Sequence, residues 1–174
     1  MLNDQNEIFH RKKYGYRGHA LRKGRHSVKG CVYLLTTVTW NRCCLFSDWR
    51  IGRLVAQAMR EAEEHGLAKS YAWVVMPDHF HWLVMLGDCS LGGLMQRVKS
   101  RSAIAVNRIS KQNGKVWQRG YYDHALRHEE NLRETARYII ANPLRAGLVK
   151  RIGDYPLWDA VWLSRKNDIL PGDE

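Results

Sequence analysis

The stretch KSYAWVVMPDHFHWLVML (residues 69–86) decides the fold of this chain. Two runs rich in β-branched and aromatic residues, 69–76 and 79–86, lie on either side of Pro77 and Asp78. Such runs are typical of strands, and a Pro-Asp pair is typical of a turn. The stretch therefore predicts two adjacent antiparallel strands joined by a tight connection.

The elements around this hairpin are predicted from helical spacing, capping residues and strand composition. We expect a strand at 31–40, helices at 47–66, 90–114 and 128–143, and loop or short extended structure at 116–127. The remainder, with Trp158 and Trp162, is expected to pack back as irregular structure. This order of elements predicts an α+β fold, a ferredoxin-like antiparallel β-sheet with helices packed on one face.

Composition divides the chain into a basic N-terminal arm (1–30), one domain (31–163) and a C-terminal tail (164–174). A length of 174 residues fits a single domain. The four cysteines form no C-x-x-C pair, which argues against a zinc knuckle and fits a reduced compartment. No apolar run approaches the roughly 20 residues that span a bilayer, and no secretory signal is recognisable. We expect a cytoplasmic, nucleoid-associated protein with no membrane partner.

The net charge of +11 is concentrated in two tracts that contain no acidic residue, one between Glu7 and Asp48 and one between Asp88 and Asp123. Such tracts indicate a polyanionic partner, most often nucleic acid, and a solvated basic surface is the alternative. For Arg127 a further alternative is an ion pair with a neighbouring glutamate. The candidates for DNA contact are Arg11, Lys12, Lys13, Arg22, Lys23, Arg25, Arg97, Lys99, Arg101 and Arg127.

The histidines of the decisive stretch are candidate metal ligands. Residues i and i+2 of a strand point to the same side, so His79 and His81 project together. Covered imidazoles cost about 1–3 kcal/mol each unless they are satisfied, and one divalent cation satisfies both. The alternative is a pair of core histidines bonded to backbone or water. Because no cysteine or third histidine lies near in sequence, an open catalytic site that takes a phosphate oxygen is favoured over a structural zinc site.

Phosphodiester chemistry also needs an attacking group, and Tyr138 has the most informative neighbourhood of the eight tyrosines. It shares a polar helix edge with Asn142, one turn further on, whose amide oxygen could be the missing ligand. A tyrosine on a helix is more often a packing residue, and Tyr121 and Tyr122 are rivals. With Trp117, these two are also candidates for stacking on unpaired bases, although core packing is favoured for Trp117.

These segments resemble a known family. MPDHFHWLV (76–84) resembles the His-hydrophobe-His (HUH) motif of single-tyrosine transposases. Segments 24–42, 116–127 and 136–149 resemble those of the REP-associated tyrosine transposases, in the same order. The resemblance implies a ferredoxin-like fold. It also implies metal ligation by His79 and His81 with Asn142 in the third position, and Tyr138 as the nucleophile.

The resemblance implies an enzyme that cleaves and rejoins single-stranded DNA beside REP-type hairpins. In the implied transesterification, Mg²⁺ or Mn²⁺ polarises the scissile phosphate while Tyr138 attacks it, giving a covalent 5′-phosphotyrosine link. Histidine ligation favours Mn²⁺, whereas cellular supply favours Mg²⁺. A monomer is favoured and a homodimer is possible. The alternatives are a metal-dependent phosphodiesterase that uses water and a DNA-binding protein without chemistry.

Overall fold

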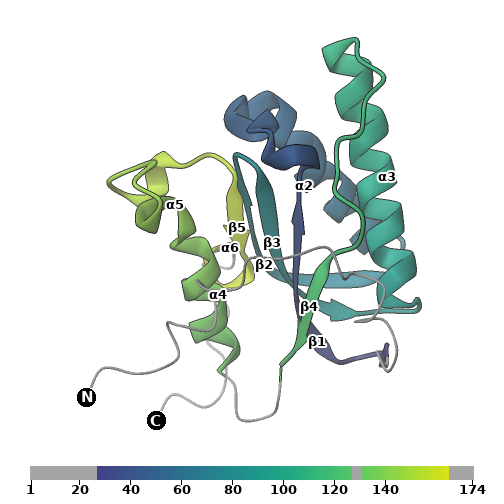
Figure 1. The fold of residues 1–174 in the computed structure, drawn as a ribbon. Coiled ribbons are helices and arrows are strands. Elements are labelled where there is room, and N and C mark those ends of the chain that lie inside the picture. Colours follow the sequence, from purple (N-terminus) through teal and green to yellow (C-terminus); the bar gives the residue numbers. More distant parts are fainter. Residues whose placement is uncertain (1–26, 127–130, 165–174) are drawn as a thin grey trace.

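The computed structural model describes residues 27–126 and 131–164 (Figure 1). Its strands are β1 (Val32–Val38), β2 (Ala68–Met76), β3 (His79–Leu86), β4 (Tyr122–Ala125) and β5 (Trp158–Ala160). Its α-helices are α2 (Trp49–Glu64), α3 (Leu91–Ser110), α4 (Leu132–Ile140), α5 (Asn142–Arg145) and α6 (Val161–Ser164). Short 3₁₀ helices are η3 (Trp40–Arg42), η4 (Leu45–Ser47) and η5 (Ile152–Asp154).

The sheet has the order β4-β1-β3-β2-β5, and all neighbouring strands are antiparallel. The predicted hairpin is confirmed, since Met76 of β2 pairs with His79 of β3 across the turn. β3 lies in the middle of the sheet, where it pairs with β1 on one side and β2 on the other. The prediction of an α+β fold with an antiparallel sheet is therefore confirmed.

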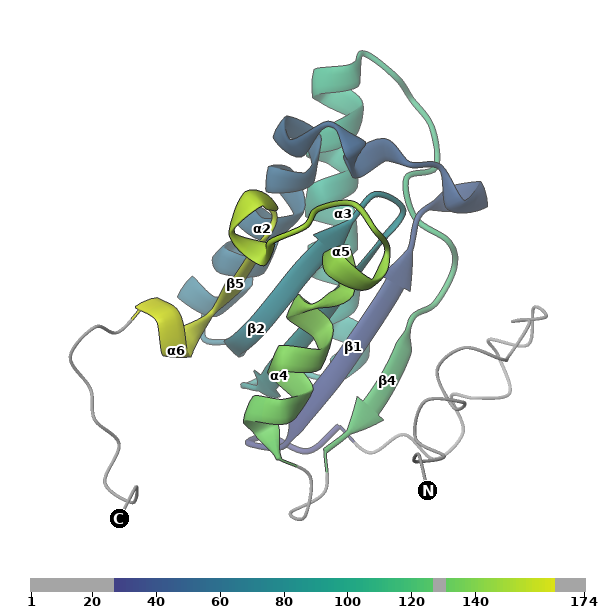
Figure 2. The ribbon, with the colours of Figure 1, turned by 90° about the vertical axis from the view of Figure 1, so that its left-hand side faces the viewer.

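Helices cover both faces of this sheet. On one face Phe80 and Trp82 of β3 are buried in the same apolar cluster as residues of α2 and α3. On the other face Leu83 is buried with Ala136 and Ile139 of α4 (Figure 2). The expected packing on one face holds for α2 and α3 and is wrong for α4. The central strands are apolar on both sides, so each side needs a cover that excludes water.

The helices begin close to where capping residues predict. The side chain of Asp48 accepts a hydrogen bond from the backbone N–H of Arg50 before α2, and that of Ser90 accepts one from Gly93 in the first turn of α3. Asn131 caps α4 in the same way, so the last long helix begins at Leu132 and not at the predicted 128. Each cap satisfies N–H groups that a helix start leaves without partners.

The C-terminal part is more regular than the sequence suggests. Residues 158–160 form β5, which pairs with β2, where irregular structure is expected. The phenol of Tyr155 donates a hydrogen bond of 2.7 Å to the carbonyl of Val75, and this contact holds the segment against β2. Within the described ranges, no helix combines the length and the apolar character needed to cross a membrane.

Some predicted features lie outside the described residues. They are most of the basic arm and nearly all of the tail, with the DNA-contact candidates Arg11, Lys12, Lys13, Arg22, Lys23, Arg25 and Arg127. For these residues the DNA contacts stay predictions. The domain bounds also stay predictions, because the structure describes few residues of the arm and of the tail.

Candidate active site

His79 and His81 lie side by side on β3, the central strand. Their ring centroids are 5.0 Å apart and the rings are nearly perpendicular, at 81°. Both side chains are partly buried. They alternate with Phe80 and Trp82, which face α2 and α3, so the two imidazoles point to the face that α4 covers. The shared direction predicted from the i, i+2 spacing is therefore present.

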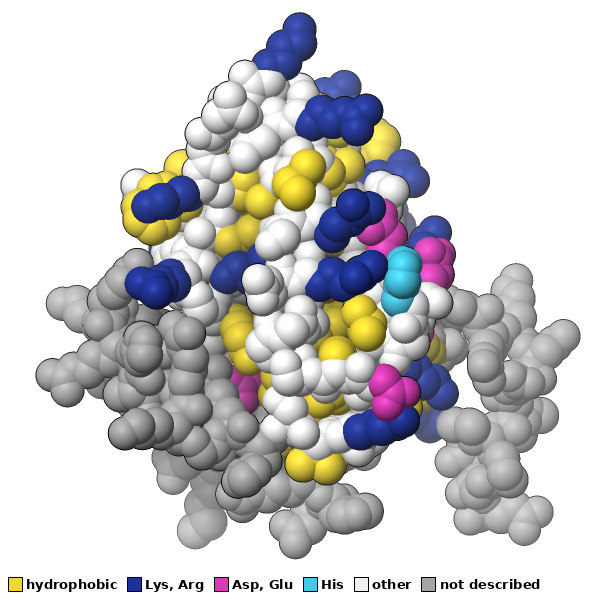
Figure 3. Space-filling model, turned by 90° about the vertical axis from the view of Figure 1, so that its right-hand side faces the viewer, with side chains coloured by type: hydrophobic (Ala, Val, Ile, Leu, Met, Phe, Trp, Pro, Cys, Tyr) yellow, Lys and Arg dark blue, Asp and Glu magenta, His cyan; other side chains and the backbone are white. Residues whose placement is uncertain are grey.

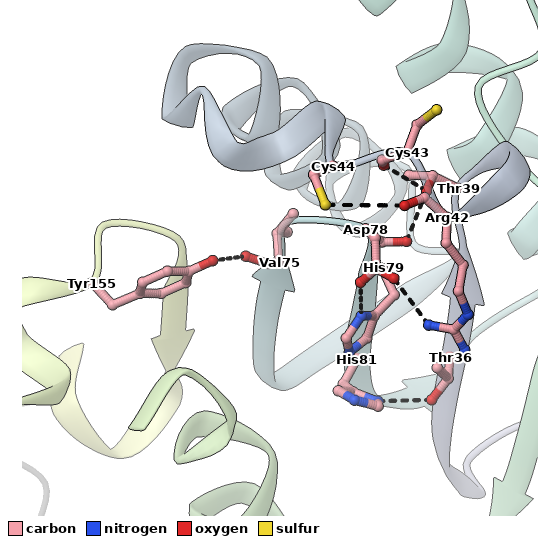
Figure 4. Close-up of polar contacts among 10 residues, drawn as sticks. All are labelled: Thr36, Thr39, Arg42, Cys43, Cys44, Val75, Asp78, His79, His81 and Tyr155. Atoms are coloured by element: carbon pink, nitrogen blue, oxygen red, sulfur yellow. Dashed lines mark hydrogen bonds and ion pairs between the residues drawn. The ribbon is translucent and has the colours of Figure 1, made fainter. Parts of the chain in front are cut away.

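The Nδ1 atom of His79 contacts a carboxylate. It lies 2.5 Å from Oδ1 of Asp78, the residue that precedes it in the turn. The other carboxylate oxygen of Asp78 accepts a hydrogen bond of 2.9 Å from Nη1 of Arg42, which follows β1 (Figure 4). The hydrogen bond with His79, with a smaller contribution from Arg42, holds the pKa of Asp78 below its ordinary value. The turn thus places a carboxylate directly behind the first imidazole.

His81 lies deeper on the same strand. Its Nδ1 atom is 2.8 Å from the hydroxyl oxygen of Thr36, the residue opposite it on β1. Burial, helped by the neighbouring His79 and Arg145, lowers the pKa of His81 from its ordinary 6.5 to about 3. The imidazole is therefore neutral at physiological pH, which is the state that a metal ion requires of a histidine ligand.

Tyr138 reaches the same face of the sheet from α4. Its side chain is partly buried and packs against the apolar cluster that contains Leu83 of β3. The guanidinium of Arg145, on α5, lies 4.1 Å from the centroid of the Tyr138 ring. Because the charge of Arg145 is also felt at His81, the tyrosine, the arginine and the histidine pair belong to one region.

Asn142 is the first residue of α5 and follows Tyr138 by one helical turn. Its side-chain Nδ2 donates a hydrogen bond of 2.7 Å to the carbonyl of Ile139. This bond fixes the orientation of the amide. An amide oxygen is a suitable ligand for Mg²⁺ or Mn²⁺.

The donor set fits a divalent cation with open coordination positions. In the described part of the chain, no group of three or more His, Cys, Asp and Glu side chains could enclose a metal. Two imidazoles alone leave several positions of such a cation for other donors, for water or for a substrate oxygen. Such an incomplete set is typical of catalytic sites and unlike the closed sets of structural zinc.

Two residues chosen from the sequence for contact with DNA have other tasks. The ammonium of Lys99 donates hydrogen bonds of 2.7 and 2.6 Å to the carbonyls of Gln118 and Gly120, and burial lowers its pKa to about 8. The ring of Trp117 is buried, and its indole N–H donates to the hydroxyl of Ser102 at 3.1 Å. Lys99 thus ties a loop to α3, and Trp117 is a buried core residue, as the sequence favoured.

The two tyrosines at the start of β4, Tyr121 and Tyr122, lie on opposite faces of the sheet. Tyr121 packs against the apolar cluster on the face of α2 and α3, away from the histidines. Tyr122 is 39% exposed and lies opposite Thr36 in the register of β4 and β1. Since cross-strand partners share a face, Tyr122 is on the side of His81, with Thr36 between them. Of the stacking candidates, Tyr122 has the position that suits the role.

Two arginines of the second basic tract do not lie with the histidines. Arg97 and Arg101 are exposed on α3, which covers the opposite face, and Figure 3 shows Lys and Arg side chains gathered on that side of the molecule. Arg101 also forms an ion pair of 3.0 Å with Glu61. Any DNA contact by these residues is therefore made away from the histidine pair.

Sequence reasoning missed four residues that surround the site. Asp78 could have been found, because a carboxylate adjacent to a candidate histidine ligand is a recognisable signal. Arg42 and Thr36 become visible only once β1 is paired with β3, and Arg145 only once α5 is folded back against α4.

Sequence and fold both match a family of DNA transposases. A family model with the description "Transposase IS200 like" matches residues 27–142, more than half of the chain. The chain belongs to this family, whose members are enzymes that act on DNA.

Its similarities within the family are more particular. A REP-associated tyrosine transposase of Escherichia coli (strain K12) is 31% identical over 134 residues, which is 76% of this chain and 78% of the relative. A solved structure described as a REP-associated tyrosine transposase bound to a REP hairpin has a TM-score of 0.65 and 25% identity, and the match covers 77% of this chain and 79% of that chain. The chain is thus a member of the REP-associated tyrosine transposases.

Proposed function

We propose that this chain cleaves and rejoins single-stranded DNA beside REP-type hairpins through a covalent 5′-phosphotyrosine intermediate. Tyr138 is the nucleophile in this proposal, and His79, His81 and Asn142 hold a divalent cation, Mg²⁺ or Mn²⁺. The observation that supports the proposal is that the histidine pair of β3 points to the sheet face that α4 covers, and that Tyr138 of α4 packs against the apolar cluster on that face.

The side chains of the site have separate tasks. The bound cation would supply charge that stabilises the phosphate as bonds to it change. Tyr138 attacks phosphorus and the bond to the 3′ oxygen breaks, so a 3′-OH leaves and the DNA stays attached to the protein. Attack by that or another 3′-OH reverses the step. The number of phosphodiester bonds is conserved, so no ATP is needed.

A hairpin with an unpaired flank is the proposed substrate. The related structure described above was solved with a REP hairpin. The net charge of +11 supplies attraction to phosphate, and this attraction should weaken steeply with salt. We further propose that residues 1–30 are a basic arm of the domain at 31–163, and that the chain acts as a monomer on DNA in the cytoplasm.

One denaturing gel tests the proposal. The full chain is mixed with Mn²⁺ or Mg²⁺ and a labelled hairpin that carries a single-stranded flank. We expect a protein–DNA adduct that survives denaturation, is abolished in Tyr138→Phe, and depends on the added cation. Tyr121→Phe is the matched control, because Tyr121 packs on the opposite face of the sheet.

The other outcomes distinguish the alternatives. Cleavage without adduct that persists in Tyr138→Phe would identify a phosphodiesterase that uses water. Tight binding without cleavage of any hairpin tested would identify a binding protein. An adduct that persists in Tyr138→Phe but is lost in Tyr122→Phe would move the nucleophile to β4.

A further inference from the structure

We propose that Asp78 and Thr36 are positioning residues that turn the Nε2 atoms of His79 and His81 toward one cation. The inference rests on the proposed metal site and deepens it. Each partner contacts Nδ1 of one imidazole, with Asp78 Oδ1 at 2.5 Å from His79 and Thr36 Oγ1 at 2.8 Å from His81 (Figure 4). Since Nδ1 is occupied on both rings, Nε2 is the nitrogen left for an ion.

The carboxylate of Asp78 selects the tautomer of His79. An ionised carboxylate can only accept a hydrogen bond, so in the neutral imidazole Nδ1 carries the proton and Nε2 carries the lone pair that a metal needs. The carboxylate thus favours the tautomer that can bind an ion, before one arrives.

The carboxylate itself is held from two directions. Nη1 of Arg42 donates to its second oxygen at 2.9 Å. The backbone of Asp78 is held by Thr39, whose N–H donates to the carbonyl of Asp78 at 2.8 Å. Arg42 and Thr39 follow β1 where it pairs with the start of β3, so one end of the sheet positions the first ligand.

Thr36 acts on His81 in a different way. A hydroxyl can donate or accept, so it fixes the direction of the ring without selecting its tautomer. When Nε2 binds a cation, Nδ1–H donates to the Thr36 oxygen. The tautomer of His79 is thus selected before metal binding by the charge of Asp78, whereas the tautomer of His81 is selected only when the metal binds. Loss of Asp78 should therefore cost more metal affinity than loss of Thr36.

Mn²⁺ binding to the full chain, followed by electron paramagnetic resonance without DNA, measures these contributions. We expect Asp78→Asn to weaken binding about 10- to 100-fold. Its amide can donate to Nδ1, which would move the ring proton to Nε2 and block the metal. Thr36→Val should weaken binding by a smaller factor. Asp88→Asn is the matched control, because Asp88 is an exposed carboxylate that pairs with Lys29.

The tautomer of His79 gives a second readout that needs no metal. Long-range ¹H–¹⁵N spectra of the imidazoles at pH 8, assigned with His79→Gln, should show the proton on Nδ1 in the wild-type chain. In Asp78→Asn the same ring should carry its proton partly or wholly on Nε2. Thermal unfolding of each variant shows whether the fold is kept. In a variant that is still folded, a change of tautomer is therefore a local effect of the substitution.

Four results would overturn the inference. Equal Mn²⁺ affinity in the wild-type chain and Asp78→Asn would remove the positioning role and leave the proposed metal site intact. A His79 proton found on Nε2 in the wild-type chain would also remove the positioning role of Asp78 and leave the proposed metal site intact. No Mn²⁺ binding by the wild-type chain, or undiminished binding by His79→Ala, would remove the metal site and this inference with it.

Discussion

The guanidinium of Arg145 covers the ring of Tyr138 at 4.1 Å, and its Nη2 donates a hydrogen bond of 2.6 Å to the carbonyl of the same residue. The two contacts hold the arginine over the phenol. A cation in this position stabilises negative charge on the phenol oxygen as the proton leaves, and it can attract a phosphate to the same place. Arg145 is therefore placed to assist the proposed nucleophile.

The first prediction is that Arg145→Leu slows formation of the Tyr138 adduct. We expect a loss of about fivefold, which corresponds to about 1 kcal/mol for an exposed cation–π contact. Single-turnover adduct formation with saturating hairpin DNA measures this step apart from binding. Arg151→Leu is the control, since Arg151 is an exposed arginine that pairs with Asp154. Equal rates in the wild-type chain and Arg145→Leu would show that the stacked cation has no part in the attack.

The second prediction concerns Tyr122. If its exposed ring stacks on an unpaired base, Tyr122→Leu should weaken binding of the single-stranded flank by about 1 kcal/mol or more, and Tyr122→Phe should keep most of it. Fluorescence anisotropy with a flanked and an unflanked hairpin separates this contribution from duplex binding. Trp49→Leu is the matched control, because Trp49 is an exposed aromatic residue on α2. Unchanged flank binding in Tyr122→Leu would rule out the stacking role.

The sequence predicted the hairpin of β2 and β3 almost to the residue, because the apolar runs are long and the turn is marked by Pro77 and Asp78. It failed for β5, whose residues 158–160 are too few to show alternation and become a strand only by pairing with β2. It also failed to place α4, because an apolar stripe shows that a helix packs but not on which face of the sheet.

In the candidate site, too, local sequence predicts some features and only the tertiary structure shows the others. The common direction of His79 and His81 follows from the period of a strand, so the sequence was sufficient. Their hydrogen-bond partners are not equally predictable. Asp78, the partner of His79, is adjacent to it in sequence, whereas Thr36, the partner of His81, is 45 residues away. Local spacing predicts ligands on one element, and only the register of β1 and β3 shows what orients them.

The third prediction separates two basic residues of α3. Lys99→Met should lower the free energy of unfolding by about 1–3 kcal/mol, because the carbonyls of Gln118 and Gly120 lose their donor. It should leave the salt dependence of DNA binding unchanged. Arg97→Met is the matched comparison on the exposed side of the helix, with stability unchanged. If Arg97 contacts phosphate, its loss lowers the slope of log K against log salt by about one.

Urea unfolding and salt-dependent anisotropy measure both quantities. A lower salt slope in Lys99→Met with unchanged stability would reverse the assignment and return Lys99 to the DNA-binding surface. An unchanged slope in Arg97→Met would show that this part of α3 does not bind phosphate.

The fourth prediction is a loss of stability at high pH that depends on Tyr155. Burial raises the pKa of its phenol from the ordinary 10 to about 12, and the phenol donates to the carbonyl of Val75. Because the folded-state pKa is the higher one, this contribution is fully present below pH 10. It is lost as pH rises toward 12, where the unfolded chain releases the proton more readily.

Urea unfolding of the wild-type chain and Tyr155→Phe between pH 8 and about 11 tests this sign. At pH 8 the wild-type chain should be more stable by about 1 kcal/mol, because the variant leaves the Val75 carbonyl without its donor. The difference should narrow above pH 10, and its size will be reduced because the phenol is still partly exposed to water. A difference that stays constant or widens with pH would show that the phenol ionises at least as easily in the folded chain as in the unfolded one. The hydrogen bond would then not be what holds the C-terminal segment on β2, the strand beside the histidine pair.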